Sequence, residues 1–112
     1  MRRTIRRGEI WWVCLDPAQG SEIRKTRPCV VVSAEQINQQ RRTPVVVPLS
    51  AAPDAAPPVV VSVPSAGGDS VAVVDQVRAV DKSRFIRTSG SLSLEDMATV
   101  ESALKRVLSL PD

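Results

Sequence analysis

Residues 9–15 read EIWWVCL, a run that is apolar on both of its alternating sets of side chains. In a β-strand successive side chains point to opposite faces of the sheet. One face would carry Ile10, Trp12 and Cys14, and the other would carry Trp11, Val13 and Leu15. We therefore expect a strand that is covered on both faces. At least one of the two tryptophans belongs in a core, and stacking on a nucleic-acid base is an alternative for the other.

The chain after this strand predicts a β-hairpin with a long, basic tip. It turns at Asp16 and Pro17, passes through the polar segment GSEIRKTRP at residues 20–28, and returns as a strand over Cys29–Ser33. Hairpin loops usually hold about two to five residues, and longer ones are often functional. The tip is therefore the first candidate for a binding or catalytic segment.

The remaining residues before position 93 predict short strands joined by turns. Strands are expected over 43–49, 59–63 and 70–80, the last broken near Asp75 and Gln76, with Ser50 at a strand end; helical turns are expected within 34–42 and over 82–84, a spacer loop over 51–58 and a turn over 65–69. Valine dominates these apolar runs and aromatic residues make up only 3% of the chain. A core filled by β-branched side chains favours a sheet.

From residue 94 the apolar residues recur at helical rather than strand spacing. They are Leu94, Met97, Ala98, Leu104, Val107 and Leu108. Ser93 is the expected N-cap, with Asp96 three residues later, and Pro111 is expected to end the helix. The pattern predicts a mainly β fold with a C-terminal helix (α+β), a small antiparallel barrel closed by that helix. Residues 1–112 would form a single domain.

Several classes of protein are excluded by composition. The chain has no histidine, and its two cysteines, Cys14 and Cys29, do not form a C-x-x-C pair, so a zinc site is excluded. We expect two buried free thiols in a reducing cytoplasm, with a disulfide as the alternative. No segment approaches the about 20 apolar residues that a membrane-spanning helix needs.

Basic residues are concentrated in the first part of the chain. Residues 1–42 contain nine Lys and Arg against four acids. Such an asymmetry indicates a polyanionic partner such as nucleic acid, although a solvated basic face is the alternative. For Arg2, Arg3, Arg6 and Arg7 the alternative is a solvated tail.

The residues available for chemistry favour RNA cleavage over other hydrolytic reactions. Nucleophilic triads and paired carboxylates are absent, but RNA carries its own nucleophile in the ribose 2′-hydroxyl. The protein must then supply proton transfer and a cation for the phosphoryl oxygens, and arginine suits phosphate. Arg24, Lys25 and Arg27 beside Glu22, with a hydroxyl from a strand end, could do this. Solvated cations in a hairpin tip are the alternative.

Three stretches of the chain carry a family resemblance: GEIWWVCLDPAQGSEIRKTRPCVVVS at 8–33, VVVPLS at 45–50 and DSVAVVDQVRAVDKSRF at 69–85. Together they resemble the MazF/PemK family of toxin endoribonucleases. The resemblance implies an SH3-like barrel that forms homodimers and cuts single-stranded RNA at short motifs, without metal or other cofactor. It also implies an antitoxin that blocks the RNA site, and binding of operator DNA only as the toxin–antitoxin complex.

The resemblance also assigns site residues. The candidate catalytic residues are Arg27, for proton transfer and phosphate stabilisation, Ser50, where the family often has threonine, and Glu22 as a supporting acid. The candidate RNA-binding residues are Ser21, Arg24, Lys25, Thr26 and Gln76. Arg24, Lys25 and Thr26 depart from the small pair common in relatives, which indicates stronger phosphate contacts. For Gln76, a buried amide bonded to the backbone is an equal alternative.

Two other functions remain open at this point. A non-catalytic RNA- or DNA-binding barrel would keep the basic tip without a catalytic Arg27. A gyrase-inhibiting toxin of the same fold is disfavoured, because the chain ends SLPD rather than in an aromatic segment. A site without histidine and without metal ligands leads us to expect cleavage products with a 2′,3′-cyclic phosphate and a 5′-hydroxyl.

Overall fold

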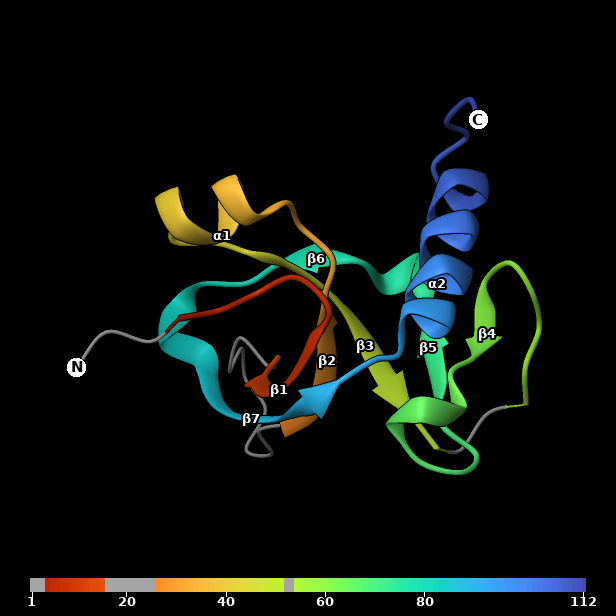
Figure 1. Cartoon of the computed structure of the whole chain (residues 1–112), viewed down its shortest axis with the longest axis horizontal. Coiled ribbons are helices and arrows are strands. Elements are labelled where there is room, and N and C mark those ends of the chain that lie inside the picture. Colours follow the sequence, from red (N-terminus) through yellow and green to blue (C-terminus); the bar gives the residue numbers. More distant parts are fainter. Residues whose placement is uncertain (1–3, 16–25, 52–53) are drawn as a thin grey trace, which may run out of the picture.

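The computed structural model describes residues 4–15, 26–51 and 54–112. In these ranges it contains β1 (Glu9–Cys14), β2 (Thr26–Val31), α1 (Glu35–Gln40), β3 (Val45–Ser50), β4 (Val60–Ser62), η1 (Pro64–Ala66), β5 (Val71–Val73), η2 (Val74–Gln76), β6 (Arg78–Ala79), η3 (Lys82–Arg84), β7 (Phe85–Ser91) and α2 (Leu94–Val107), where η denotes a 3-10 helix. The predicted class, mainly β with a C-terminal helix, is confirmed (Figure 1).

Strand β3 lies at the centre of the sheet and has partners on both edges. It pairs with β2 on one edge, and with β6 and then β5 on the other, all antiparallel. The hydrogen-bonded order is β4-β5-β3-β2-β1-β7. No ladder joins β4 to β7 among the described residues, so the sheet curls like a barrel without closing. Figure 1 shows α2 beside β5 and β4, away from β1 and β7.

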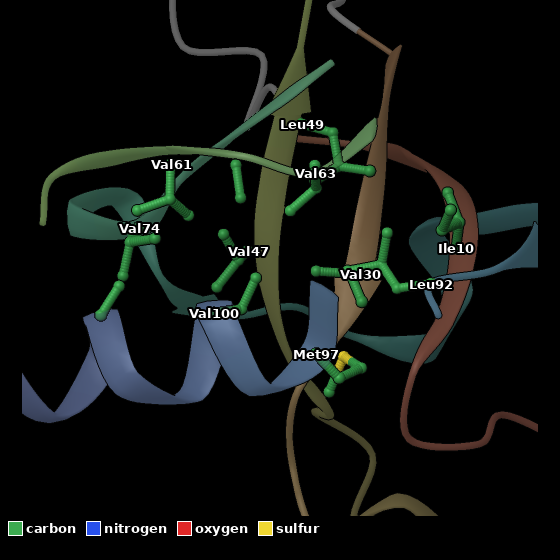
Figure 2. Close-up of a cluster of buried hydrophobic side chains, with 12 residues drawn as sticks. Ile10, Val30, Val47, Leu49, Val61, Val63, Val74, Leu92, Met97 and Val100 are labelled. Atoms are coloured by element: carbon green, nitrogen blue, oxygen red, sulfur yellow. The ribbon is translucent and has the colours of Figure 1, made fainter. Parts of the chain in front are cut away.

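The first of two hydrophobic clusters lies between α2 and the sheet. It contains Ile10, Val30, Val47, Leu49, Val61, Val63, Ala72, Val74, Leu92, Met97, Val100 and Ala103. Figure 2 shows Met97 and Val100 pointing from the helix toward Val30 and Val47. Burying one such side chain stabilises the fold by about 1.5–3 kcal/mol. This cluster therefore attaches the helix to the sheet.

The second cluster lies on the other face of the same strands, as the alternation in residues 9–15 predicts. It contains Ile5, Trp11, Val13, Leu15, Cys29, Val31, Val46, Val80 and Phe85. Trp11 meets Phe85 edge to face, with 5.7 Å between ring centroids. Trp12 points the opposite way, is half-buried, and lies 5.2 Å from the Arg87 guanidinium. The prediction that at least one tryptophan is a core residue is confirmed.

The N-terminus of α2 is capped as predicted, but its apolar face is narrower than predicted. Ser93 Oγ accepts a hydrogen bond from the Asp96 N–H at 3.0 Å. The buried Asp96 carboxylate accepts from the Ser65 N–H at 2.8 Å, which ties the helix to η1. Leu94, which belongs to the apolar pattern at helical spacing, is not part of the buried face, because this first residue of the helix is 90% exposed. Ala98 is also exposed, and the helix ends at Val107, before Pro111.

Strand β7 was not expected from the sequence. Only Phe85 of its seven residues is buried, so its side chains show no alternation between apolar and polar. It pairs with β1 at the edge of the sheet, with two shifts of register. Backbone pairing to an apolar neighbour, rather than a pattern of its own, makes this segment a strand.

Two smaller expectations are corrected. Arg7 does not belong to a solvated tail: its side chain forms a 2.7 Å ion pair with Glu101 and donates from Nε to the Val32 carbonyl at 3.1 Å. Arg2 and Arg3 lie outside the described residues. Both cysteines are free as predicted, but only Cys29 is buried, because Cys14 is half-exposed.

Candidate active site

Strands β2 and β3 bring Arg27 and Ser50 together. The two strands pair Cys29 with Pro48, Val30 with Val47 and Val31 with Val46. Continuing this antiparallel register by two residues, within the bounds of both strands, places Arg27 opposite Ser50. Residues directly opposite each other share a sheet face, with Cβ atoms about 4.5–5.5 Å apart. The two candidate catalytic residues are therefore cross-strand neighbours.

Both residues are held by strands on either side. Arg27 pairs with Val13 of β1, and Ser50 pairs with Val71 of β5. Both side chains are half-buried, so each is positioned by the sheet and still accessible to a ligand. Arg27 projects from the face that carries Cys29 and the second hydrophobic cluster. A cation and a hydroxyl thus stand at one end of a rigid, apolar platform.

Two further arginines converge on this end of the sheet. Arg78, on β6, donates from Nη2 to the Leu15 carbonyl at 3.1 Å. Arg84, at the end of η3, donates from Nη1 to the Cys14 carbonyl at 3.4 Å. We call Arg27, Arg78 and Arg84 the arginine cluster. The sequence prediction missed Arg78 and Arg84, although Arg78 ends the D-Q-V-R stretch that carried part of the family resemblance.

Two arginines of this cluster act electrostatically on the buried Cys29 thiol. Burial raises the pKa of the Cys29 thiol to about 12, while the positive charges of Arg78 and Arg27 act in the opposite direction. The ion pairs among the described residues are Arg7–Glu101 and Arg42–Asp81, so neither involves Arg27 or Arg78. The site therefore offers positive charge to an incoming anion.

The other predicted site residues have different outcomes. Thr26 is exposed and, as the neighbour of Arg27 in β2, points to the opposite face. Gln76 is exposed at the end of η2, so the alternative of a buried amide is wrong. Ser21, Glu22, Arg24 and Lys25 lie outside the described residues.

In the described parts of the chain, no three His, Cys, Asp or Glu side chains gather in a way that could hold a metal ion. Within the same ranges, no helix is long and apolar enough to cross a membrane.

Comparison with known proteins places the chain in a family. Residues 6–108 match the PemK-like, MazF-like toxins of type II toxin–antitoxin systems. The chain belongs to this family. A curated relative, endoribonuclease MazF9 of Mycobacterium tuberculosis, is 37% identical over 115 aligned residues, covering 95% of this chain and 98% of the relative. PemK/MazF proteins are toxin endoribonucleases, so the predicted family and enzyme class are confirmed.

Solved structures of PemK/MazF proteins share the fold of this chain. A MazE–MazF structure from Deinococcus radiodurans has a TM-score of 0.83 at 22% identity, covering 98% of this chain and 100% of that one. A mycobacterial endoribonuclease in complex with its cognate antitoxin has a TM-score of 0.79 at 20% identity, covering 99% of both chains. These similarities confirm the barrel-like architecture.

Proposed function

We propose that this PemK/MazF toxin cuts single-stranded RNA at short sequence motifs without a metal ion, using Arg27 and Ser50. The observation that carries the proposal is the register of β2 and β3, which, continued by two residues, sets Arg27 opposite Ser50 on one sheet face. Both side chains are half-buried and can meet a phosphate from solvent. Arginine fits this role because its planar, permanently charged fork binds two phosphate oxygens at once.

The reaction that fits these residues is an internal transfer within the RNA. The ribose 2′-oxygen loses its proton and bonds to the adjacent phosphorus, and the bond from phosphorus to the 5′-oxygen of the next nucleotide breaks. The departing 5′-oxygen takes up a proton. The products are a 2′,3′-cyclic phosphate and a 5′-hydroxyl, so the nucleophile comes from the substrate rather than from the protein.

Arg27 would stabilise the negative charge that builds on the phosphoryl oxygens and assist proton transfer. The Ser50 hydroxyl would donate a hydrogen bond to the same oxygens, which matters most where charge develops in the transition state. Glu22 would act as a supporting acid for Arg27. We assign RNA binding to Ser21, Arg24, Lys25, Thr26 and Gln76.

The proposed partners follow from the family. Solved relatives include complexes with a cognate antitoxin and MazE–MazF assemblies. We propose that this chain works as a homodimer in the cytoplasm. Its antitoxin would cover the Arg27–Ser50 site, and operator DNA would be bound only by the toxin–antitoxin complex.

The test is to incubate the pure protein with a mixed RNA in excess chelator and to sequence the new ends. We expect cuts at a short recurring motif with cyclic phosphate and 5′-hydroxyl ends. Arg27→Ala should abolish cutting while weakening RNA binding only partly. Persistent failure to cut, or 5′-phosphate ends, would contradict the mechanism. Small and equal losses of cutting and binding in Arg27→Ala would indicate a non-catalytic binding protein.

A further inference from the structure

Arg78 reaches the candidate active site from a distant part of the chain. Its strand, β6, pairs with β3 through Arg78 opposite Val46, on the edge of β3 away from β2. Val46 belongs to the second hydrophobic cluster, so Arg78 shares the sheet face of Arg27 and Cys29. From there its guanidinium extends to the Leu15 carbonyl, where β1 ends. The side chain thus starts opposite Val46 and reaches, through the Leu15 carbonyl, toward the end of the sheet at which Arg27 lies.

The hydrogen bond to the Leu15 carbonyl orients the Arg78 guanidinium but uses only one of its N–H donors. This 3.1 Å bond comes from Nη2 alone. A guanidinium has several N–H donors in a rigid planar fork, and its other nitrogens remain for further partners. The residue as a whole is exposed. Arg78 is therefore pre-oriented, which lowers the entropy lost when it binds a ligand.

The charge around Arg78 favours an anionic ligand. Both Arg78 and Arg27 act on the buried Cys29 thiol, which places two positive charges around one point of the sheet. Neither guanidinium takes part in an ion pair in the described parts of the chain. Like charges at close range repel, and a bound phosphate relieves that repulsion.

We propose that Arg78 is a second phosphate-binding residue of the site, gripping an RNA phosphate next to the one held by Arg27. This inference deepens the proposed function and rests on it for the identity of the ligand. Arg78 would bind the substrate backbone rather than take part in bond breaking. Its loss should weaken RNA binding and make that binding less dependent on salt.

The probe is a short single-stranded RNA whose riboses are 2′-O-methylated, so that it binds without being cut. Binding is measured over a range of salt concentrations for the wild-type protein, Arg78→Gln and Arg78→Lys. Glutamine keeps a polar side chain with an N–H donor but carries no charge, whereas lysine keeps the charge. Arg106→Gln is the matched control, because Arg106 is exposed on the last turn of α2, which packs on the first cluster.

A single-strand phosphate contact contributes about 0.7 to the slope of log K against log salt. We expect Arg78→Gln to lower the slope by about that amount, Arg78→Lys to recover most of it, and Arg106→Gln to leave it unchanged. Thermal unfolding checks that each variant is folded. A slope in folded Arg78→Gln equal to that in Arg106→Gln would overturn the inference, and so would a lack of probe binding by the wild-type protein.

The same proteins are also incubated with RNA that carries no 2′-O-methyl groups and can therefore be cut, which separates the two proposals. Cutting by the wild-type protein with no slope change in Arg78→Gln would leave the proposed function standing and remove the role of Arg78. A lowered slope in Arg78→Gln without any cutting by the wild-type protein would leave Arg78 as a phosphate ligand and remove the nuclease proposal.

Discussion

Replacing Ser50 by the isosteric pair threonine and valine tests whether its hydroxyl acts in the transition state. The two side chains have nearly the same shape, both suit a strand, and they differ mainly in the hydroxyl. The backbone of Ser50 is paired with Val71 and should not respond to either change. Loss of one such donor typically lowers kcat by about 10²–10³.

The burial of Ser50 sets where in that range the effect should fall. A donor is worth most in a site without water, and the Ser50 side chain is only half-buried. We therefore expect kcat for Ser50→Val to be about 10²-fold below that of Ser50→Thr, which corresponds to about 2.7 kcal/mol of transition-state stabilisation.

The assay is single-turnover cleavage of a defined RNA at saturating protein, with binding measured separately on 2′-O-methylated RNA. Binding should differ little between the two variants, and Ser50→Thr should cut as well as the wild-type protein. Equal cleavage rates for folded Ser50→Thr and Ser50→Val would refute a role for the hydroxyl.

Three further predictions concern stability and thiol chemistry. Val100→Ala should destabilise the protein by about 2 kcal/mol in urea unfolding, because it removes two methyl groups from a fully buried position. The control is Leu94→Ala, at a 90% exposed position of the same helix, which should change stability by less than about 0.5 kcal/mol. Hydrogen bonds hold the pKa of Glu35 below its ordinary value of 4.5, so the contribution of Glu35 to stability is present above that pH and is lost as the pH falls through the lower pKa of the folded state. In acid unfolding, the stability of Glu35→Gln should therefore fall less steeply with pH than that of the wild-type protein. Equal steepness would contradict this prediction. Because the Cys29 pKa is about 12, a thiol reagent at neutral pH should label half-exposed Cys14 well before Cys29, as peptide mapping would show; the reverse order would contradict the burial of Cys29.

Strands with a strong apolar pattern could be predicted from the sequence, and strands without one could not. The apolar runs of residues 9–15 and of β3 indicate strands by composition alone, although in residues 9–15 the face of Trp11, Val13 and Leu15 is buried while the opposite face is buried only at Ile10. Strand β7 is exposed apart from Phe85 and depends on pairing with β1, which is a long-range property. For α2, periodicity identified the helix but not the width of its buried face, because Leu94 lies beyond the edge of the sheet contact.

For the candidate site, too, some residues could be predicted from the sequence and others could not. Arg27 and Ser50 could be proposed because the residues around them carry the family pattern, and the register of β2 and β3, continued by two residues, sets them opposite each other. Arg78 could not be placed from the sequence, since its contact with Leu15 spans 63 residues and depends on how β6 pairs with β3. The roles of Glu22, Arg24 and Lys25 remain predictions.

The central claim is that the substrate supplies the nucleophile while Arg27 and Ser50 stabilise the phosphoryl charge. The most direct measurement uses one RNA that contains a single cleavage motif, with and without a 2′-deoxy substitution on the nucleotide that precedes the cut. We predict that the all-ribose RNA is cut and that the substituted RNA binds equally well but stays intact. Cutting of the substituted RNA at the same bond would contradict the account.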